Sequence, residues 1–353
     1  MRSAELVEAI GSLPLGNVRL MEVCGTHTMS IAKAGLKSLL PSHIRLSSGP
    51  GCPVCVTPPE VMDAIFRLTE RPEVTVVSYG DMLRVPGSVR KDSLAARKAR
   101  GASVEIVYSP MDAVDYAAAH PERQVVFLGV GFETTAPGTG ASVLAAAERR
   151  VKNYTVLSML KRVEPALRAL IGSDGFNVQG FLCPGHVASI VGAGAFRFLP
   201  AEYGLPAVVA GFEPADILEA VYRLCRMLAE GKPDLENQYV RAVRPEGNPL
   251  AVGMMEQVFC PRRDVWRGLG KIPDSGLELR PEYAEHDAQK RFEIEYAATG
   301  AQTVCRCGEI ITGRMEPRQC PLFGASCTPE DPVGPCMVSS EGACAAAYKY
   351  QGI

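Results

Sequence analysis

Residues 124–151 read QVVFLGVGFETTAPGTGASVLAAAERRV, and this stretch decides the fold class. Its first seven residues are almost continuously apolar and rich in valine, which predicts a buried strand over Gln124–Val130. A loop of glycine and threonine follows, and a helical pattern then runs over Gly138–Val151. A buried strand followed directly by a helix is typical of a parallel sheet covered by helices.

The same order of strand, loop and helix recurs along most of the chain. Strands are predicted at Val18–Val23, Ile44–Ser47, Val74–Ser78, Val104–Tyr108, Gln124–Val130, Tyr154–Leu157, Val178–Leu182 and Ala207–Ala210. Helices are predicted at Thr28–Leu40, Pro58–Glu70, Ser88–Arg100, Gly138–Val151, Leu160–Leu170, His186–Phe198 and Ala215–Glu230. Four strands on each side of residue 121 indicate an α/β protein with two similar parallel-sheet domains, residues 1–121 and 122–244, facing a central cleft.

Residues 245–353 have a different pattern. Asn248 is expected to cap a helix over Pro249–Phe259. Residues 263–270 (RDVWRGLG), an irregular glycine- and proline-rich stretch and a helical patch around Glu285–Phe292 follow. Residues 305–344 read CRCGEIITGRMEPRQCPLFGASCTPEDPVGPCMVSSEGAC and hold six of the twelve cysteines. This segment has too few apolar residues to order itself by burial, so we expect a loop-rich C-terminal domain held by a metal centre.

The charge and the apolar runs of the chain argue against some classes of binding partner. The chain has 353 residues, with 37 basic and 39 acidic side chains and a net charge of −2, so no charge excess favours nucleic acid or an anionic membrane. No apolar run reaches the length of a membrane span, and the opening MRSAELVEAIGSLPLG has no apolar signal region. We therefore expect a cytoplasmic protein, in which clustered cysteines more often serve metal or redox chemistry than structural disulfides.

The spacing of the C-terminal cysteines indicates which kind of metal centre they would bind. Structural zinc usually takes cysteine pairs two to four residues apart, and the only close pair, Cys305 and Cys307, is tighter than that. Cys305, Cys320, Cys327 and Cys344 follow the spacing C-x14-C-x6-C-x16-C through glycine and proline loops. Four wide-spaced thiolates favour a [4Fe–4S] cluster over zinc, although zinc loops also vary in length.

Five short motifs lie where predicted strands end. They are Cys24–Thr28 (CGTHT), Gly49–Cys55 (GPGCPVC), Tyr79–Asp81 (YGD), Gly131–Thr135 (GFETT) and Cys183–His186 (CPGH). Loops that follow the carboxyl ends of parallel strands carry the chemistry in such folds, so two facing sheets would gather these motifs around one cleft.

Cys52 and Cys55 form a C-x-x-C motif before a predicted helix. Thr57 and Glu60 are expected to form a capping box with Pro58 as the first helical residue, so that the helix N-terminus favours a thiolate. No second C-x-x-C exists to complete a structural zinc site, which favours redox or catalytic use of the pair.

Each of the other candidate residues, considered alone, also has a structural interpretation. Cys24 offers a soft ligand for iron and His27 a proton carrier, yet a buried cysteine beside a turn is common. Asp81 and Glu133 are expected to cap helices or shape turns. Cys183 and His186 fit either a ligand pair or turn chemistry, and Cys225 and Cys260 are expected to be structural. The sequence GVGFET lacks the third glycine of a dinucleotide fingerprint and the lysine of a P-loop.

Together the motifs and the cysteine spacing resemble the HypD family of [NiFe]-hydrogenase maturation factors, from about residue 20 to the C-terminus. The resemblance implies a scaffold on which an Fe(CN)2CO group is assembled. HypC, a small iron-binding chaperone, and HypE, a cyanide donor, are the implied partners.

The resemblance also implies roles for individual residues. Cys24 would ligate the iron of Fe(CN)2CO with His27 beside it, and Cys52 and Cys55 would be a redox-active pair. Asp81, His186 and Glu341 match polar positions associated with function. The implied [4Fe–4S] ligands are Cys305, Cys320, Cys327 and Cys344, with Cys307 and Cys336 as a second dithiol beside the cluster.

Two other functions remain compatible with these residues. One is an iron–sulfur thiol–disulfide oxidoreductase that uses Cys52 and Cys55 without any Fe(CN)2CO. The other is an interaction scaffold without catalytic activity, in which the metal is structural.

Overall fold

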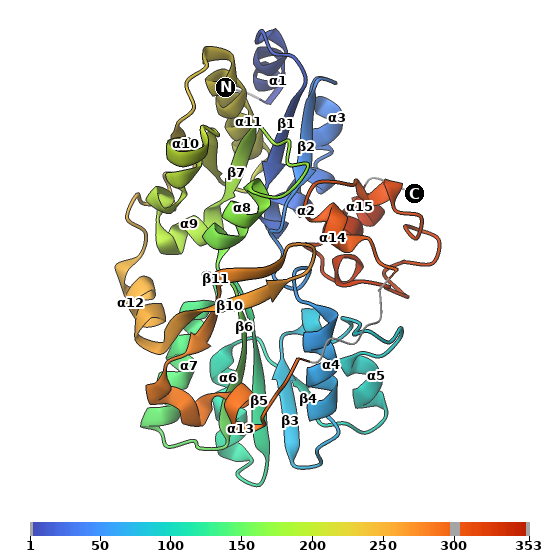
Figure 1. Ribbon diagram of the computed structural model, residues 1–353, viewed down its shortest axis with the longest axis vertical. Coiled ribbons are helices and arrows are strands. Elements are labelled where there is room, and N and C mark those ends of the chain that lie inside the picture. Colours follow the sequence, from blue (N-terminus) through green and yellow to red (C-terminus); the bar gives the residue numbers. More distant parts are fainter. Residues whose placement is uncertain (1–2, 297–303, 351–353) are drawn as a thin grey trace.

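The computed structural model describes residues 3–296 and 304–350, and it contains two parallel sheets with helices around them (Figure 1). The first sheet has the order β2-β1-β7-β8-β9 and the second the order β4-β3-β5-β6. The strands of the first sheet are β1 (Val18–Glu22), β2 (Ile44–Ser48), β7 (Gly180–Pro184), β8 (Ala207–Ala210) and β9 (Leu235–Asn237). Those of the second are β3 (Val74–Ser78), β4 (Val104–Ile106), β5 (Gln124–Gly131) and β6 (Tyr154–Leu160). The expected α/β class with two parallel sheets is confirmed.

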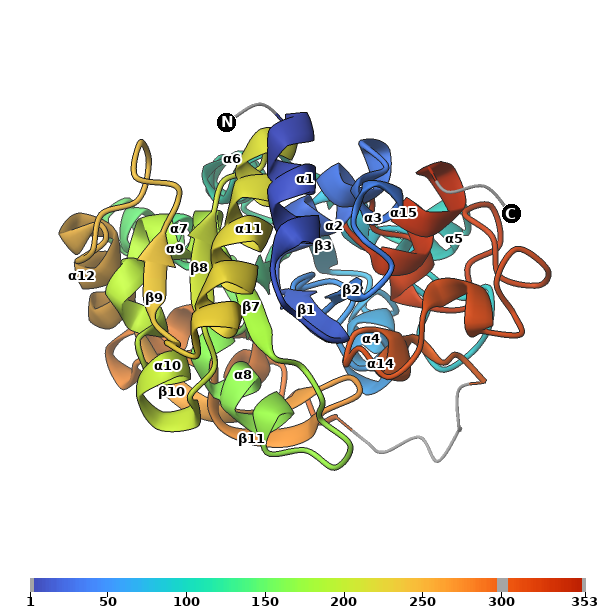
Figure 2. The same ribbon diagram turned by 90° about the horizontal axis from the view of Figure 1, so that it is seen from above.

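Helices cover both faces of each sheet, and α1 and α11 lie side by side against one face of the first (Figure 2). The helices along the first sheet are α1 (Ser3–Ser12), α2 (Gly25–Lys33), α3 (Leu36–Leu39), α9 (Gly185–Val191), η2 (Ala193–Phe196), α10 (Phe198–Tyr203) and α11 (Pro214–Glu230). The others that join the strands are α4 (Pro59–Leu68), η1 (Gly80–Met82), α5 (Leu94–Ala99), α6 (Pro110–Ala119), α7 (Ala136–Glu148) and α8 (Val163–Ile171). No helix in the described ranges is long and apolar enough to cross a membrane.

All eight strands expected from the apolar runs are present. β3, β6, β7 and β8 are buried along their whole length, which is why their sequences show no alternation of apolar and polar residues. β9 was not expected, because its three half-buried residues at the edge of the first sheet are too few to make a pattern.

The strands do not divide between the sheets at residue 121. β1 pairs with β7 as well as with β2, so the chain begins the first sheet, builds the second one completely, and then returns to the first. The expected boundary falls between β4 and β5, inside the second sheet. Burial patterns identify a strand of a parallel sheet, but strands buried on both faces look alike and do not reveal their neighbours.

Residues 259–279 form an antiparallel hairpin of β10 (Phe259–Trp266) and β11 (Gly270–Leu279), where an irregular stretch was expected. The hairpin packs on β6 and α8, and the buried Lys161 ammonium lies 2.9 Å from the Asp264 carboxylate. The preceding helix α12 (Pro249–Val258) begins with the expected Asn248 cap and packs on α7. The following elements η3 (Pro281–His286) and α13 (Ala288–Arg291) pack on β6.

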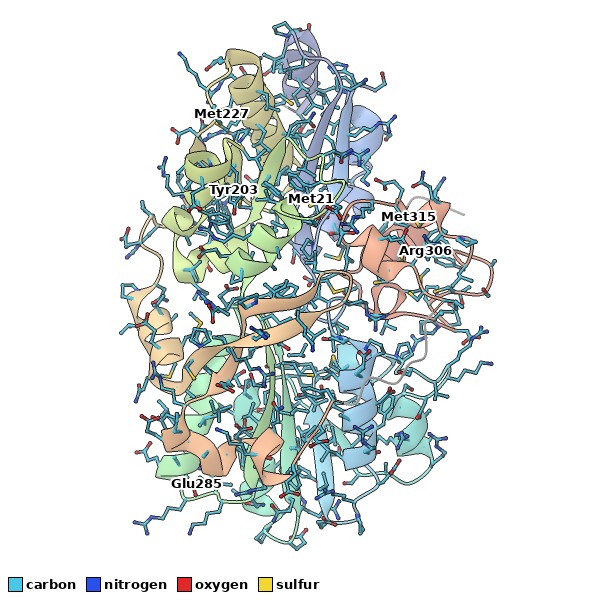
Figure 3. The ribbon with its side chains drawn as sticks, in the orientation of Figure 1. Met21, Tyr203, Met227, Glu285, Arg306 and Met315 are labelled. Carbon is cyan, nitrogen blue, oxygen red and sulfur yellow. A yellow bond between two sulfur atoms is a disulfide. The ribbon has the colours of Figure 1, made fainter. Side chains whose placement is uncertain are left out.

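Residues 249–291 thus belong with the second sheet, and only the cysteine-rich segment, residues 304–350, stands apart from it. This segment contains α14 (Cys307–Ile310), η4 (Pro317–Gln319), η5 (Pro335–Met337) and α15 (Ala343–Tyr350), and α15 packs on α2. In Figure 3, Arg306 and Met315 of the segment lie to the right of Met21 of β1, whereas Glu285 of η3 lies near the lower end of the molecule.

Candidate functional site

A cavity of about 310 Å³ opens where the carboxyl ends of the two sheets meet. Its walls include four of the residues singled out in the sequence: Cys24, Asp81, His186 and Glu341. Cys24 follows β1, His186 follows β7, Asp81 follows β3, and Glu341 comes from the cysteine-rich segment. The cavity therefore joins loops of both sheets and the C-terminal segment at one point, as the edge rule for parallel sheets predicts.

Cys24 is the N-cap residue of α2, and its side chain is buried. The pKa of the thiol is raised to about 12, chiefly by burial and then by the nearby Glu341 carboxylate, and the backbone N–H groups of His27 and Thr26 offset this rise only in part. The thiol is therefore protonated at pH 7 when no metal is bound to it. A metal that binds Cys24 must displace this proton, and the helix N-terminus then stabilises the thiolate.

Two glycines allow the chain to pack closely around Cys24. The Gly25 N–H donates to the Gly51 carbonyl at 2.9 Å, and a Cβ on Gly51 would collide with the backbone nitrogen of Cys24. A Cβ on Gly25 would collide with the side chain of Glu341. The Thr26 hydroxyl donates to Glu341 at 2.6 Å, which ties the cysteine-rich segment to the first turn of α2.

The two histidines of the site differ in position. His27 is fully buried, and its Nε2–H lies 2.9 Å from the Gly211 carbonyl and 3.2 Å from that of Ala210. Burial lowers the pKa of His27 to about 4, so the ring is neutral at pH 7, and it lies behind the cavity wall rather than in it. His186 lines the cavity and stacks on Phe212 with ring centroids 4.0 Å apart.

Cys52 and Cys55 form a disulfide in the loop between β2 and α4. Both side chains are buried, while the intervening Pro53 and Val54 line the cavity. The expected capping box is wrong: α4 begins at Pro59, and the Thr57 hydroxyl donates to the Pro53 carbonyl at 3.0 Å instead. With two prolines in succession, the helix begins one residue later than expected. Thr57 therefore stabilises the C-x-x-C loop and does not cap the helix.

Glu22 is a buried residue of this site that we did not single out from the sequence. Its carboxylate accepts the Cys24 N–H at 3.0 Å and the Thr28 hydroxyl at 2.5 Å, so it fixes the turn that carries Cys24. Burial raises its pKa to about 7. The available signal was an acidic residue inside the apolar run LMEV, where a charge is costly unless it is hydrogen-bonded.

Glu133 has the capping role expected from the sequence. Its Oε1 accepts the N–H of Val163, the first residue of α8, at 2.9 Å. Its neighbours Phe132 and Thr134 line the Cys24 cavity, whereas Glu133 itself lines a second pocket on the other side of the loop.

The six cysteines of the C-terminal segment lie close together in space. The Cys307 side chain hydrogen-bonds with those of Cys305 and Cys336, and the Cys336 side chain hydrogen-bonds in turn with that of Cys344. The pKa of Cys327 is raised by burial first, and the nearby Cys305 and Cys320 raise it further. Cys344 likewise interacts with Cys305 and Cys327.

This donor set fits the implied [4Fe–4S] cluster. Backbone N–H groups point at the sulfur atoms: Cys307 N–H to Cys305 at 3.4 Å, Val333 N–H to Cys327 at 3.3 Å and Cys344 N–H to Cys336 at 3.3 Å. Such N–H donors stabilise cluster thiolates and tune their potential. A Cβ on Gly334 would collide with the Cys305 sulfur, so the absence of a side chain at Gly334 leaves room for this sulfur. Among the described residues, no group of three His, Cys, Asp or Glu side chains is arranged to bind one metal ion. In a cubane cluster each thiolate binds a different iron, so the four ligands need not share one ion.

The fold and the site define a class of protein: a two-sheet α/β scaffold with a cysteine in its central cavity, a disulfide beside it and a cysteine-rich C-terminal segment. A family model described as HypD, the Hydrogenase formation hypA family, matches residues 2–351. The chain belongs to the HypD family of hydrogenase maturation factors.

Relatives match along almost the whole chain. The hydrogenase maturation factor HypD of Rhodobacter capsulatus is 43% identical over 354 residues, which cover 99% of this chain and 93% of the relative. That of Escherichia coli K12 is 45% identical over 340 residues, covering 95% and 89%. The hydrogenase expression/formation protein HupD of Azotobacter chroococcum is 44% identical over 343 residues, covering 96% and 90%.

Proposed function

We propose that this chain is the cytoplasmic scaffold on which an Fe(CN)2CO group is assembled for a [NiFe]-hydrogenase, together with HypC and HypE. The observation that carries the proposal is the Cys24 thiol in the wall of a cavity large enough for a small metal complex, which Asp81, His186 and Glu341 also line. Thiolate is a soft ligand suited to iron that carries cyanide and carbon monoxide.

Cys24 binds the incoming iron as a thiolate, so its proton has to leave. Burial lowers the pKa of His186, which makes its imidazole a neutral acceptor in the same cavity. The N–H groups of Thr26 and His27 then stabilise the negative sulfur. Asp81 and Glu341 line the cavity as well, and they provide polar contacts to the complex.

Cys52 and Cys55 have the redox role in this proposal. Reduction of their disulfide takes two electrons and two protons and yields two thiols next to the iron site. Cys305, Cys320, Cys327 and Cys344 would hold a [4Fe–4S] cluster, which supplies one-electron reduction chemistry when it is bound. Cys307 and Cys336 form a second dithiol in contact with these ligands.

The second candidate function is an iron–sulfur thiol–disulfide oxidoreductase. The buried disulfide beside a cavity and the convergent cysteines favour it, and it needs no Fe(CN)2CO. Such an enzyme would turn over dithiol substrates through Cys52 and Cys55 whether or not Cys24 is present.

Infrared spectroscopy of the anaerobically purified chain with its HypC partner separates the two candidates. The scaffold should show cyanide and carbonyl stretching bands, and Cys24→Ser should lose them, because a serine hydroxyl stays protonated and is a hard donor. Cys225→Ser, at a fully buried cysteine in α11, is the matched control and should keep the bands. Bands that persist in Cys24→Ser would show that this residue does not anchor the iron.

A further inference from the structure

The turn of the β10–β11 hairpin lies against the loop that carries the disulfide. Arg267 is the first residue of this turn, directly after β10. Its backbone N–H donates to the Val56 carbonyl at 2.9 Å, and its Nε–H donates to the Thr57 carbonyl at 3.1 Å. Val56 and Thr57 directly follow Cys55, so Arg267 fixes the end of the Cys52–Cys55 loop.

The next residue of the turn contacts the cysteine-rich segment. The backbones of Gly268 and Gly308 pack so closely that a Cβ on Gly268 would lie 2.6 Å from the Gly308 carbonyl oxygen. These two glycines directly follow Arg267 and Cys307 in the chain. The Cys307 N–H donates in turn to the Cys305 sulfur at 3.4 Å. The turn therefore brings Arg267 next to two cysteines of the segment.

The charge of Arg267 acts on both of these thiols. The hydrogen bond with Cys307 raises the pKa of Cys305, burial raises it further, and the charge of Arg267 opposes the rise. Cys307 also has a raised pKa. Its hydrogen bond with Cys305 lowers this pKa, the one with Cys336 and burial raise it, and the charge of Arg267 lowers it. A guanidinium does not lose its proton in proteins, so this charge is permanent.

We propose that Arg267 is a positioning residue for the redox chemistry of the cysteine-rich segment. The hairpin turn holds its guanidinium beside Cys305 and Cys307, where its positive charge favours the reduced state of a bound [4Fe–4S] cluster. The inference rests on the cluster that the proposed function assigns to this segment. Reduction adds an electron to a group that four thiolates already make anionic. The potential of such a group depends on the charges and hydrogen bonds around its sulfur atoms.

The turn is anchored independently of the Arg267 side chain. Trp266, the residue before it, is buried, and its Nε1–H donates to the Ser275 hydroxyl at 2.9 Å. Leu269 packs against the same apolar core as the cysteines of the segment. The bond from the Arg267 backbone N–H to Val56 does not involve the side chain. A substitution at Arg267 should therefore change the charge beside the cysteines and leave the hairpin in place.

A potentiometric titration of the full chain tests the proposal. The protein is reconstituted anaerobically with iron and sulfide and reduced stepwise with dithionite, while the charge-transfer absorbance reports the midpoint potential of the cluster. Arg267→Gln and Arg267→Ala should each lower this potential by about 59 mV, a tenfold change in the one-electron equilibrium. Arg267→Lys keeps the positive charge and should restore most of the difference. A side chain that only holds the Thr57 carbonyl would leave the potential unchanged in all three variants.

Two further variants serve as controls. Arg263→Gln removes an exposed arginine from β10 of the same hairpin and should keep the potential of the unmodified protein. Arg267→Gln combined with Cys24→Ser should show the same decrease as Arg267→Gln shows relative to the unmodified protein, because the effect does not depend on iron at Cys24.

The outcomes separate this inference from the proposed function. Equal potentials in Arg267→Gln and the unmodified protein would overturn the role of Arg267 and leave the cluster assignment intact. An equal decrease in Arg263→Gln, a decrease that Arg267→Lys does not restore, or one that disappears with Cys24→Ser would do the same. Neutral variants that take up no cluster would show that Arg267 serves cluster assembly and not the potential. An unmodified protein that binds no cluster would overturn both the cluster assignment and the inference.

Discussion

At the scale of single residues, burial sets the chemistry of the site more strongly than neighbouring charge does. The helix N-terminus directs two N–H groups at Cys24, yet desolvation still keeps this thiol protonated. Glu22 and Glu133 follow the same rule, since each carboxyl accepts hydrogen bonds and still has its pKa raised to about 7. A sequence reveals residue types and spacing, but the depth of burial that decides their protonation comes from the tertiary fold.

Glu133 makes this rule testable through the pH dependence of stability. Its pKa rises from 4.5 to about 7 in the folded state, chiefly through burial, so the folded protein holds this proton more tightly than the unfolded chain does. The stabilisation is complete below pH 4.5 and is lost as the pH rises to 7. Compared with Glu133→Gln, the unmodified protein should therefore lose up to roughly 3 kcal/mol of unfolding free energy over this range.

Urea unfolding of both proteins at several pH values measures the difference directly. Taking the difference removes the contribution of Glu22, which titrates in the same range in both proteins. Glu148→Gln, at an exposed carboxyl, should show a nearly constant difference from the unmodified protein. A constant difference for Glu133→Gln as well would show that Glu133 is not buried in this way.

At the scale of elements, the sequence predicts the strands and the loops of the site but not their partners. The eight apolar runs became strands, and the motifs at their carboxyl ends meet around one cavity. The pairing of β1 with β7 and the hairpin of β10 and β11 were not predictable, because they depend on contacts between residues far apart in the chain. Glu341 was identified through the family resemblance alone, since nothing in its own segment indicates the contact with Thr26.

The close approach of two loops at Gly51 gives an element-scale prediction. Gly51→Ala places a methyl group against the backbone nitrogen of Cys24, and neither backbone can move without displacing β1 or α2. We expect a loss of about 1–3 kcal/mol of unfolding free energy, as for overpacked interiors, together with a loss of the iron binding proposed for Cys24. Thermal unfolding and iron titration measure the two effects.

Gly80→Ala is the matched control for this change. Gly80 also lies close to the carboxyl end of a strand, as the first residue of η1 after β3, but a Cβ there would meet nothing within 4 Å. This variant should keep both stability and iron binding. If Gly51→Ala behaved like Gly80→Ala, the loop of Cys52 would not be packed against Cys24 as the structure has it.

At the scale of the whole molecule, the cysteine-rich segment connects the two sheets across the cavity. On one side Glu341 accepts the hydroxyl hydrogen of Thr26, next to the first sheet. On the other side Arg90, in the loop after β3, donates to the Ser326 carbonyl at 3.2 Å and forms a salt bridge with Asp331 at 2.8 Å. Exposed polar contacts of this kind contribute little by themselves. Apolar side chains of the segment, among them Ile310, Ile311 and Met337, are buried in the main hydrophobic core and anchor it there. The loops between these anchors depend on internal order, and the cysteines are the groups able to provide it.

The last prediction follows from this dependence. Cys327→Ala removes one proposed cluster ligand whose sulfur accepts the Val333 N–H, so anaerobically reconstituted protein should lose the charge-transfer absorbance of a [4Fe–4S] cluster. Amide hydrogen exchange should then accelerate in residues 326–341 and, through the Arg90 contacts, in residues 84–91. Exchange in β8, which lies between β7 and β9 in the first sheet, should stay slow because that strand is buried by its own sheet and helices.

Cys260→Ala serves as the control, because Cys260 is a half-buried cysteine on β10 outside the C-terminal group. It should keep both the absorbance and the slow exchange. The two readouts separate two parts of the argument. A full cluster in Cys327→Ala would remove this residue from the ligand set. Loss of the cluster without faster exchange in residues 326–341 would mean that packing on α2, rather than the metal centre, orders the segment that closes the cavity.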